Sequence, residues 1–359
     1  MNHLLEIRQL GESIWLDNLS RTLLREGVLS KRLEEDGVCG VTSNPSIFYK
    51  AISESPYYKD DLARLKASEP GIERRYEALA IPDVQEACDL LLPIFNISGG
   101  NDGYVSLEVS PYLADDEEKT VSEAHRLKAA VNRVNLLVKV PATPAGIRAF
   151  ERLTADGVNV NVTLIFSLQH VLHVFEAYIR GLRARLAGGG DIKTAKAVAS
   201  LFLSRVDTLV DKQLAAIGSP AALTLQGKSA VAMAKLAYQR YNDLFHGAPF
   251  AELEKAGARP QYLLWASTGT KNPNYSDVMY VEPLIGRETI NTAPDATLDA
   301  ARDHARAMLS IEEGVPEAQA HYLKLEQLGI SMYQVGEQLQ QEGVKLFAEA
   351  FDKLLELMR

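Results

Sequence analysis

Short apolar segments alternate with amphipathic helical patterns along the whole chain of 359 residues. The helical patterns, such as residues 117–132 and 167–187, place apolar residues three and four positions apart. Strands that are each joined to the next through a helix normally pair in parallel. The segments expected to form strands are 13–19, 37–43, 104–110, 135–141, 160–166, 197–204, 262–268 and 279–285.

Eight strand–helix units can close on themselves as a (β/α)8 barrel. The rival architecture is an open, doubly wound sheet, but the chain lacks a G-x-G-x-x-G turn after its first strand. Barrels of this kind often exceed 250 residues as one domain. We therefore predict a single α/β domain over residues 1–359, a TIM barrel with additional helices. Residues 331–359 form one amphipathic pattern, predicting a C-terminal helix that either packs on the barrel or covers its mouth.

Composition and charge exclude several classes of protein. The formal net charge of −9 argues against broad contact with a nucleic-acid backbone. The N-terminal residues lack a basic region followed by a long apolar core, and no run of about 18 apolar residues follows, so neither a secretory signal nor a membrane helix is expected. The two cysteines, Cys39 and Cys88, have no metal-type or disulfide spacing, which fits the reducing cytoplasm.

One lysine lies inside an otherwise apolar strand. Lys139 is flanked by Val138 and Val140 in "NLLVKVP", although burying an ammonium group is costly. A lysine that protects an edge strand would explain an isolated case, but a closed barrel has no edges. Alternation along other strands also creates polar faces, and in a barrel these faces meet at the carboxyl-terminal rim. These polar residues are Asp17, Ser106, Glu108, Ser110, Asn159, Asn161, Thr163, Ser200 and Ser204.

A buried amine can serve as a nucleophile toward a carbonyl group, because desolvation disfavours its charged form. Amine and ketone give an iminium ion, which is an electron sink for breaking a neighbouring carbon–carbon bond. Such chemistry needs acid/base groups, and Asp17 and Glu108 are available. The seven histidines show no convincing metal-ligand spacing, so no metal is predicted. Lys139 is therefore predicted to be the Schiff-base amine.

Four segments of the chain together resemble the transaldolase family. They are "VTSNPSIF" at 41–48, "LLVKVPAT" at 136–143, "NVTLIFS" at 161–167 and "ASLFLSRVD" at 199–207. The resemblance extends from "IWLDNLSR" to the closing helix, and the length resembles the longer bacterial branch of the family. It implies a (β/α)8 barrel that uses no metal or organic cofactor.

The resemblance also implies catalytic roles. Lys139 is similar in position to the lysine that forms the Schiff base. Asp17 resembles the acid/base that handles the C4 hydroxyl of the donor during cleavage. Glu108 resembles the carboxylate that acts through a water molecule and the hydroxyl of Thr163 when the Schiff base forms and is hydrolysed.

Substrate-binding roles follow from the same resemblance. Asn44 and Asn161 resemble amides that bond the substrate hydroxyls. Ser200 is expected to bond the dihydroxyacetone portion, and Phe202 to line the pocket. Arg205 resembles an arginine that holds the substrate phosphate, a task suited to its fixed fork of donors.

The chain departs from the family pattern after the seventh strand. Shorter members place a serine and a second arginine there, whereas the segment "WASTGTKNP" keeps Ser267 and has no arginine. Lys271 is predicted to supply the second charge, helped by Ser267, Thr268 and backbone N–H groups of the turn. The alternative is a solvated loop lysine.

The resemblance implies a transferase of the non-oxidative pentose phosphate pathway. It would move a dihydroxyacetone unit from sedoheptulose 7-phosphate or fructose 6-phosphate to glyceraldehyde 3-phosphate or erythrose 4-phosphate. Phosphorylated sugars are the expected partners, and the chain is expected to act as a monomer or homodimer. One alternative is a Schiff-base fructose 6-phosphate aldolase, although those relatives are much shorter and tend to carry tyrosine in place of Phe202. The other is a catalytically silent barrel that binds sugar phosphates.

Overall fold

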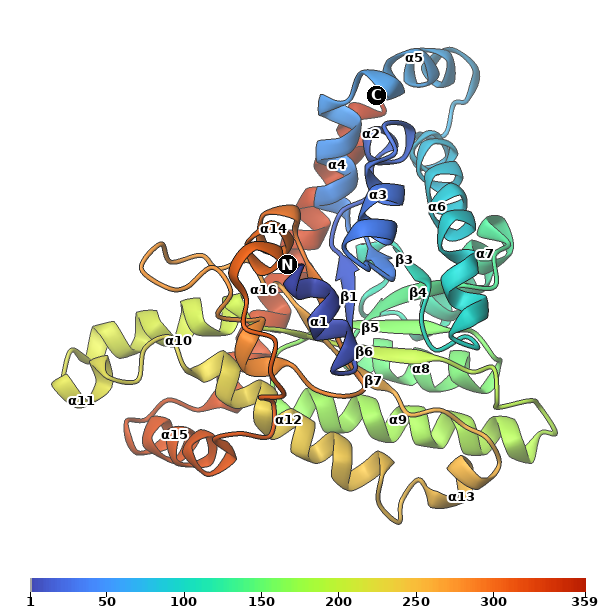
Figure 1. The fold of residues 1–359 in the computed structure, drawn as a ribbon. Coiled ribbons are helices and arrows are strands. Elements are labelled where there is room, and N and C mark those ends of the chain that lie inside the picture. The colour runs from blue at the N-terminus through green and yellow to red at the C-terminus, as the bar shows by residue number, and fades with distance from the viewer. Residues whose placement is uncertain (1) are drawn as a thin grey trace.

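Eight parallel strands close into a barrel in the computed structural model, which describes residues 2–359 (Figure 1). Each strand pairs with the next along the chain, and the last pairs with the first. This confirms the predicted (β/α)8 fold. The strands are β1 (Glu12–Leu16), β2 (Gly40–Thr42), β3 (Tyr104–Glu108), β4 (Leu136–Pro141), β5 (Val160–Ile165), β6 (Ala197–Phe202), β7 (Tyr262–Ala266) and β8 (Thr289–Ala293).

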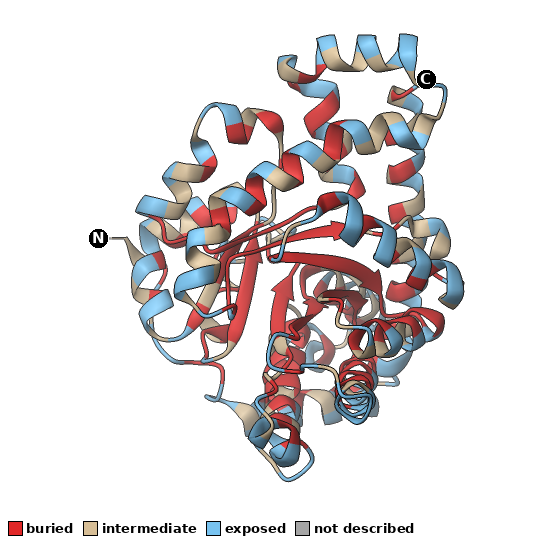
Figure 2. Ribbon diagram, turned by 90° about the vertical axis from the view of Figure 1, so that its right-hand side faces the viewer, coloured by how far each residue is buried: buried red, intermediate tan, exposed pale blue. Residues whose placement is uncertain are grey.

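Helices surround the barrel, and Figure 2 shows buried strands at the centre and helices whose outer faces are exposed. The predicted helices at 117–132 and 167–187 are confirmed as α7 and α9. The helices are α1 (His3–Gln9), α2 (Arg21–Arg25), α3 (Val28–Glu35), α4 (Pro45–Glu54), α5 (Lys59–Ser68), α6 (Ile72–Ile97), α7 (Glu117–Val131), α8 (Pro144–Ala155), α9 (Leu168–Ala187), α10 (Ser204–Ile217), α11 (Pro220–Leu223), α12 (Ser229–Phe245), α13 (Ala251–Lys255), α14 (Asp295–His304), α15 (Val315–Gln327) and α16 (Met332–Leu357). Within the described residues, no helix has the length and apolar character needed to cross a bilayer.

The prediction of the eighth strand was wrong. Residues 279–285 form a turn and the short 3-10 helix η3 (Glu282–Leu284), and the strand is the later segment "TINTA". Pro283 explains the difference, because a proline cannot donate to the ladder of a central strand. Tyr280, Val281, Leu284 and Ile285 are nevertheless buried, and the side chain of Asn291 on β8 donates to the carbonyl of Tyr280 and links the segment to the barrel.

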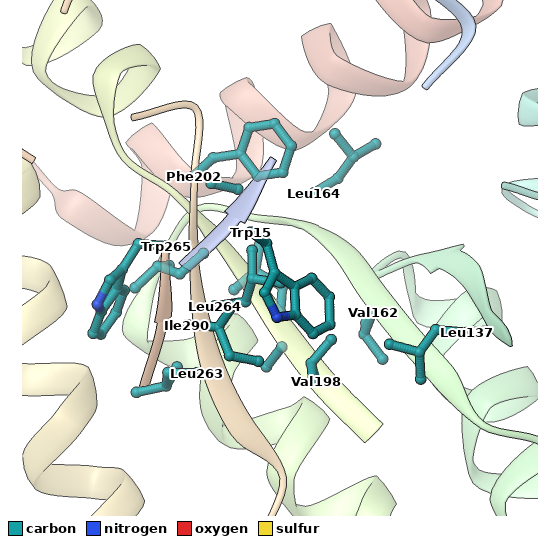
Figure 3. Close-up of a cluster of buried hydrophobic side chains, with 14 of the residues drawn as sticks. Trp15, Leu137, Val162, Leu164, Val198, Phe202, Leu263, Leu264, Trp265 and Ile290 are labelled. Carbon is teal, nitrogen blue, oxygen red and sulfur yellow. The ribbon is translucent and has the colours of Figure 1, made fainter. Parts of the chain in front are cut away.

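An apolar layer fills the barrel below its carboxyl-terminal rim (Figure 3). Each residue of this layer precedes by two positions a residue at the rim, so both point inward from the same strand. A Cβ atom at Gly40 would collide with the indole of Trp15, so glycine lets the ring lie across β2. The residues that form the layer are Trp15, Leu137, Val198, Leu264 and Ile290.

The C-terminal helix α16 lies across the ends of β4 and β5. The side chain of Gln340 donates to the carbonyl of Ala142 at 2.9 Å and to that of Leu164 at 3.1 Å. Leu164 adopts a φ of 59° beside a break in the pairing register of β5 and β6, and its carbonyl reaches the helix. The helix both packs on the barrel and brings Phe347 over its mouth, so the two alternatives left open by the sequence are both realised.

The buried carboxyl of Glu12 should make folding stability depend on pH. Burial raises the pKa of Glu12 from 4.5 to about 8, while a hydrogen bond from Thr289 partly opposes the shift. The folded state therefore holds this proton at pH values where the unfolded chain has lost it, so stability falls as pH rises through this window. Between pH 5 and pH 8, we expect the free energy of unfolding of the wild type to fall by about 3 kcal/mol more than that of Glu12→Gln. Urea unfolding at the two pH values measures the free energy of unfolding of both proteins. An equal change between pH 5 and pH 8 in both would contradict the prediction.

Candidate active site

Lys139 lies on β4 inside the barrel and is 5% exposed. Its Nζ atom is 2.5 Å from Oε1 of Glu108 and donates to the carbonyl of Ser43 at 2.9 Å. The pairing register of β3 and β4 sets Glu108 directly opposite Lys139, which explains the close contact. The buried lysine therefore has a carboxylate partner.

Glu108 is half of this ion pair and is itself largely buried. Burial raises the pKa of Glu108, and the negative charge of Asp17 adds to the rise, while the charge of Lys139 opposes it. A carboxylate that accepts protons more readily than usual, in direct contact with an amine, is suited to taking a proton from that amine and returning it.

Asp17 follows β1 directly and faces the same space. Its backbone N–H donates to the carbonyl of Ala293, which fixes the chain at the strand end. The hydroxyl of Thr42 donates to Oδ1 of Asp17 at 2.7 Å and lies 2.6 Å from the hydroxyl of Thr292. Burial raises the pKa of Asp17, although the charge of Lys139 opposes the shift. Asp17 is thus a second carboxyl prepared to accept a proton.

Asn161 is held in one orientation by two serines. Its Nδ2 donates to Ser106 Oγ at 3.1 Å, and Ser200 Oγ donates to its Oδ1 at 2.7 Å. Thr163, two residues further along β5, has a buried hydroxyl with no hydrogen-bond partner among residues 2–359. That hydroxyl is free to bind a water molecule or a substrate atom beside Lys139.

Asn44 begins helix α4 and reaches the same cavity. Its Oδ1 accepts from the backbone N–H of Ile47 at 3.0 Å, and Pro45 takes the first helical position, where a missing N–H costs nothing. The cap fixes the oxygen of the amide, so its Nδ2 remains to donate to a substrate.

Arg205 stands at the other side of the cavity, in the first turn of α10. Its guanidinium carbon lies 5.6 Å from the ring centre of Phe202, and its Nη1 is buried without a partner among the described residues. Burial lowers the pKa of Arg205. Beside it, Ser267 has a φ of 56° and its hydroxyl lies 2.8 Å from that of Ser204. This end of the site offers unused donors to an anion.

Most of these side chains line one cavity of about 170 Å³ at the carboxyl ends of the strands, whereas Asn161 is fully buried and is not among the lining residues. Glu108 lines an adjoining hollow together with Lys139, Thr163 and Phe347. Lys271 is exposed and does not line the cavity, although its charge weakly opposes the rise that burial causes in the pKa of Asp17. The cavity is lined by Asp17, Thr42, Asn44, Ser46, Lys139, Thr163, Ser200, Phe202, Arg205, Ala266, Ser267, Thr292 and Phe347.

Several residues of the site were missed by sequence reasoning. Thr42 carries a local signal, since it lies two positions after Gly40 on an inward face. Thr292 was missed because the eighth strand was placed too early. Phe347 and Gln340 have no local signal, because only the path of α16 brings them to the barrel mouth.

Comparison with known proteins gives a consistent result. A family model described as "Transaldolase/Fructose-6-phosphate aldolase" matches residues 14–358. A transaldolase of Thiobacillus denitrificans is 59% identical over 99% of this chain and 99% of its own length. A transaldolase of Neisseria gonorrhoeae is 48% identical with the same coverage. A protein named transaldolase 2 from a Nostoc species is 44% identical over 99% of this chain and 96% of its own length.

Proposed function

This chain belongs to the transaldolase/fructose-6-phosphate aldolase family, and from that premise we propose that its barrel site carries out dihydroxyacetone transfer through a Schiff base on Lys139. The chain is an enzyme of the transaldolase type, a transferase of aldehyde or ketone residues. The observation that carries the proposed mechanism is the buried amine of Lys139, 2.5 Å from Glu108 and in one cavity with Asp17.

The first step joins the donor ketose to the enzyme. Nζ of Lys139 adds to the C2 carbonyl, and Glu108, which contacts the amine directly, takes the proton that the amine loses. Return of a proton to the C2 hydroxyl lets water leave, and the iminium ion forms. The unpartnered hydroxyl of Thr163 is suited to holding this water near Glu108.

Cleavage uses the second carboxylate. Asp17 takes the proton of the C4 hydroxyl, the C3–C4 bond breaks, and its electron pair moves to C3, neutralising the iminium as an enamine. The aldose phosphate leaves, and the three-carbon unit stays on Lys139. Two separate carboxylates therefore handle the two ends of the donor, one at C2 and one at C4.

Transfer reverses these steps with another aldehyde. The enamine attacks the carbonyl carbon of the acceptor, Asp17 returns a proton to the new hydroxyl, and water then hydrolyses the iminium and frees Lys139. Phe202 and Phe347 line the cavity and are 8% and 9% exposed, so they limit the water that could protonate the enamine early. This apolar cover favours transfer over simple aldolase cleavage.

The competing aldolase activity has a direct test. With fructose 6-phosphate alone, an aldolase accumulates free dihydroxyacetone on every turnover, whereas a transferase holds the unit and stops after one. Adding erythrose 4-phosphate should then restore turnover and yield sedoheptulose 7-phosphate. Steady release of dihydroxyacetone without an acceptor, at the rate of the complete reaction, would assign the aldolase activity instead.

We further propose how the enzyme works in the cell. Donors and acceptors would be the phosphorylated sugars of the non-oxidative pentose phosphate pathway, and no metal or organic cofactor takes part in the proposed steps. The chain would act as one domain, alone or as a homodimer, in the cytoplasm. Both cysteines are free and buried, which is compatible with a reducing compartment.

Arg205 is expected to bind the substrate phosphate. Replacing it with glutamine removes charge-assisted hydrogen bonds worth about 1.5–3 kcal/mol, so KM for phosphorylated substrates should rise about 10- to 100-fold. KM for an unphosphorylated donor should barely change. The matched control is Lys212→Gln, an exposed cation on the same helix. Equal effects of Arg205→Gln on both kinds of substrate would remove it from the phosphate role, and Lys271→Gln, measured in parallel, tests the second proposed cation.

A further inference from the structure

A second cavity lies outside the barrel, between helices α12 and α15. These helices run side by side, far along the chain from one another (Figure 1). The cavity has a volume of about 380 Å³, within the range of small-ligand pockets. None of its lining residues lines the active-site cavity. They are Leu225, Lys228, Val231, Ala232, Lys235, Gly314, Glu317, Ala318, His321 and Lys324.

Positive charge exceeds negative charge among the residues that line this cavity. Lys228, Lys235 and Lys324 line it, and Glu317 is the one carboxylate among the lining residues. Burial lowers the pKa of Lys235, and the charge of nearby Glu313 opposes this shift. None of the three lysines forms an ion pair with a described residue. The lysines that do so in residues 2–359 are Lys31, Lys119, Lys139 and Lys345.

Lys235 places one of these charges deep in the cavity wall. It is 9% exposed, and its Nζ donates to the carbonyls of Pro283 at 2.9 Å and Ser310 at 2.6 Å. An ammonium group has three donors, so one N–H of Lys235 remains unused. Lys228 and Lys324 are both exposed and stand nearer to solvent. An anion could therefore be drawn in by the outer lysines and bonded by the inner one.

His321 adds a neutral donor, and its pKa responds to the charges of the neighbouring lysines. It is 7% exposed, and its Nε2 lies 2.9 Å from Oγ of Ser229. Burial, together with the charges of Lys228 and Lys324, lowers the pKa of His321 to about 4. The ring is thus neutral at pH 7. When Nε2 accepts from Ser229, the proton lies on Nδ1, which has no partner among the described residues.

We propose that this cavity binds a small anion that carries a phosphate group. Three lysines around a recess in a chain of net charge −9 form a local site of the opposite sign, and lysine binds phosphate as a point charge. The site lies outside the barrel and shares no lining residue with the active-site cavity, so a ligand bound there would not occupy the place of the substrate. The proposal rests on the contacts of α12 and α15 and is independent of the reaction at Lys139.

The ring of His321 provides a direct test in the full-length enzyme. Its proton resonance, identified by its absence in His321→Gln, is followed while inorganic pyrophosphate is added, and sodium chloride is added to a second sample at matched ionic strength. We expect the chemical shift of this resonance to change saturably with pyrophosphate, with a dissociation constant of about 1 mM or lower. The pKa of His321 should rise when pyrophosphate is bound, because a nearby anion favours the charged ring.

Three variants separate this site from other phosphate contacts. The double variant of exposed residues, Lys228→Gln with Lys324→Gln, should weaken pyrophosphate binding about 10- to 100-fold. Lys212→Gln should bind as the wild type does, and so should Arg205→Gln when the His321 resonance is followed. The proposal would be overturned if pyrophosphate left the His321 resonance unchanged, or if sodium chloride caused the same change in its chemical shift. It would also be overturned if the double variant bound pyrophosphate as tightly as the wild type does.

Discussion

Replacing Lys139 with methionine should lower the rate of dihydroxyacetone transfer by about 10⁴-fold or more, because removing a covalent nucleophile leaves little of the catalytic route. Methionine keeps much of the volume and the apolar contacts with the walls of the barrel. Glu108 then loses its cationic partner, but burial already raises its pKa, so the carboxyl can become neutral instead of remaining as an unpaired charge. The rate is measured with fructose 6-phosphate and erythrose 4-phosphate.

A second buried lysine provides the matched control. Lys196 precedes β6 at the opposite end of the barrel, where its Nζ lies 3.5 Å from the ring centre of Tyr262. It does not line the active-site cavity. Lys196→Met makes the same chemical change in the same barrel and should leave the rate within about threefold of the wild type, since no transition-state contact is lost. Substantial turnover by Lys139→Met, with its circular dichroism unchanged, would contradict the assigned nucleophile.

Replacing Asp17 with asparagine should lower kcat by about 10²- to 10⁴-fold, the range for loss of a general acid/base. Asparagine can still accept the hydrogen bond from Thr42, so the local structure should survive. The Schiff base itself should still form, because Glu108 and not Asp17 contacts the amine. Borohydride should therefore trap the whole six-carbon donor on the Asp17→Asn enzyme, since the C3–C4 bond no longer breaks.

Two further variants sharpen this prediction. Thr42→Val removes the hydrogen bond to Asp17 and keeps the carboxylate, so we expect a loss of only about tenfold. Asp295→Asn changes another carboxyl near the barrel mouth, which contacts Asn18, and should have little effect on kcat. If Asp17→Asn gave only the three-carbon adduct at the normal rate, cleavage would not depend on Asp17. If it gave no adduct, Asp17 would act before cleavage.

The barrel could be predicted because its signals are local. Apolar segments of strand length, separated by helical patterns, are visible without any tertiary contact, and β1 to β7 lie where they were expected. The eighth strand shows the limit of this reasoning. "TINTA" contains one large apolar residue, Ile290, whereas the buried segment before it is richer in apolar residues and still cannot be a strand because of Pro283. The side chains of Asn291 and Trp265 donate to the carbonyls of Tyr280 and Leu284 and link this segment to the barrel, and no sequence pattern reveals these contacts.

The site was predictable to the extent that side chains alternate along strands. Alternation alone places Lys139, Asn161 and Ser200 on inward faces, and the closed barrel brings them together. The contact of Lys139 with Glu108 depends on the register of β3 and β4, which no tight turn fixes in a parallel pair. The resemblance implied that Glu108 acts through a water and Thr163, whereas the structure also gives it a direct contact with the amine.

The remaining features come from elements that meet only in the folded chain. Phe347 reaches the cavity because Gln340 ties α16 to the ends of β4 and β5. The cationic cavity likewise joins Lys228 and Lys324, which are almost one hundred positions apart and become neighbours through the packing of α12 on α15. Tertiary contacts of this kind leave no periodic trace in the sequence.

Borohydride trapping with fructose 6-phosphate, followed by peptide mass analysis, tests the central claim most directly. The Schiff base on Lys139 predicts a reduced three-carbon adduct on the peptide that contains residues 136–143, and its loss when erythrose 4-phosphate is added before the reductant. An adduct on another peptide, such as one containing Lys196, or no adduct in an enzyme that turns over both sugars, would contradict the account.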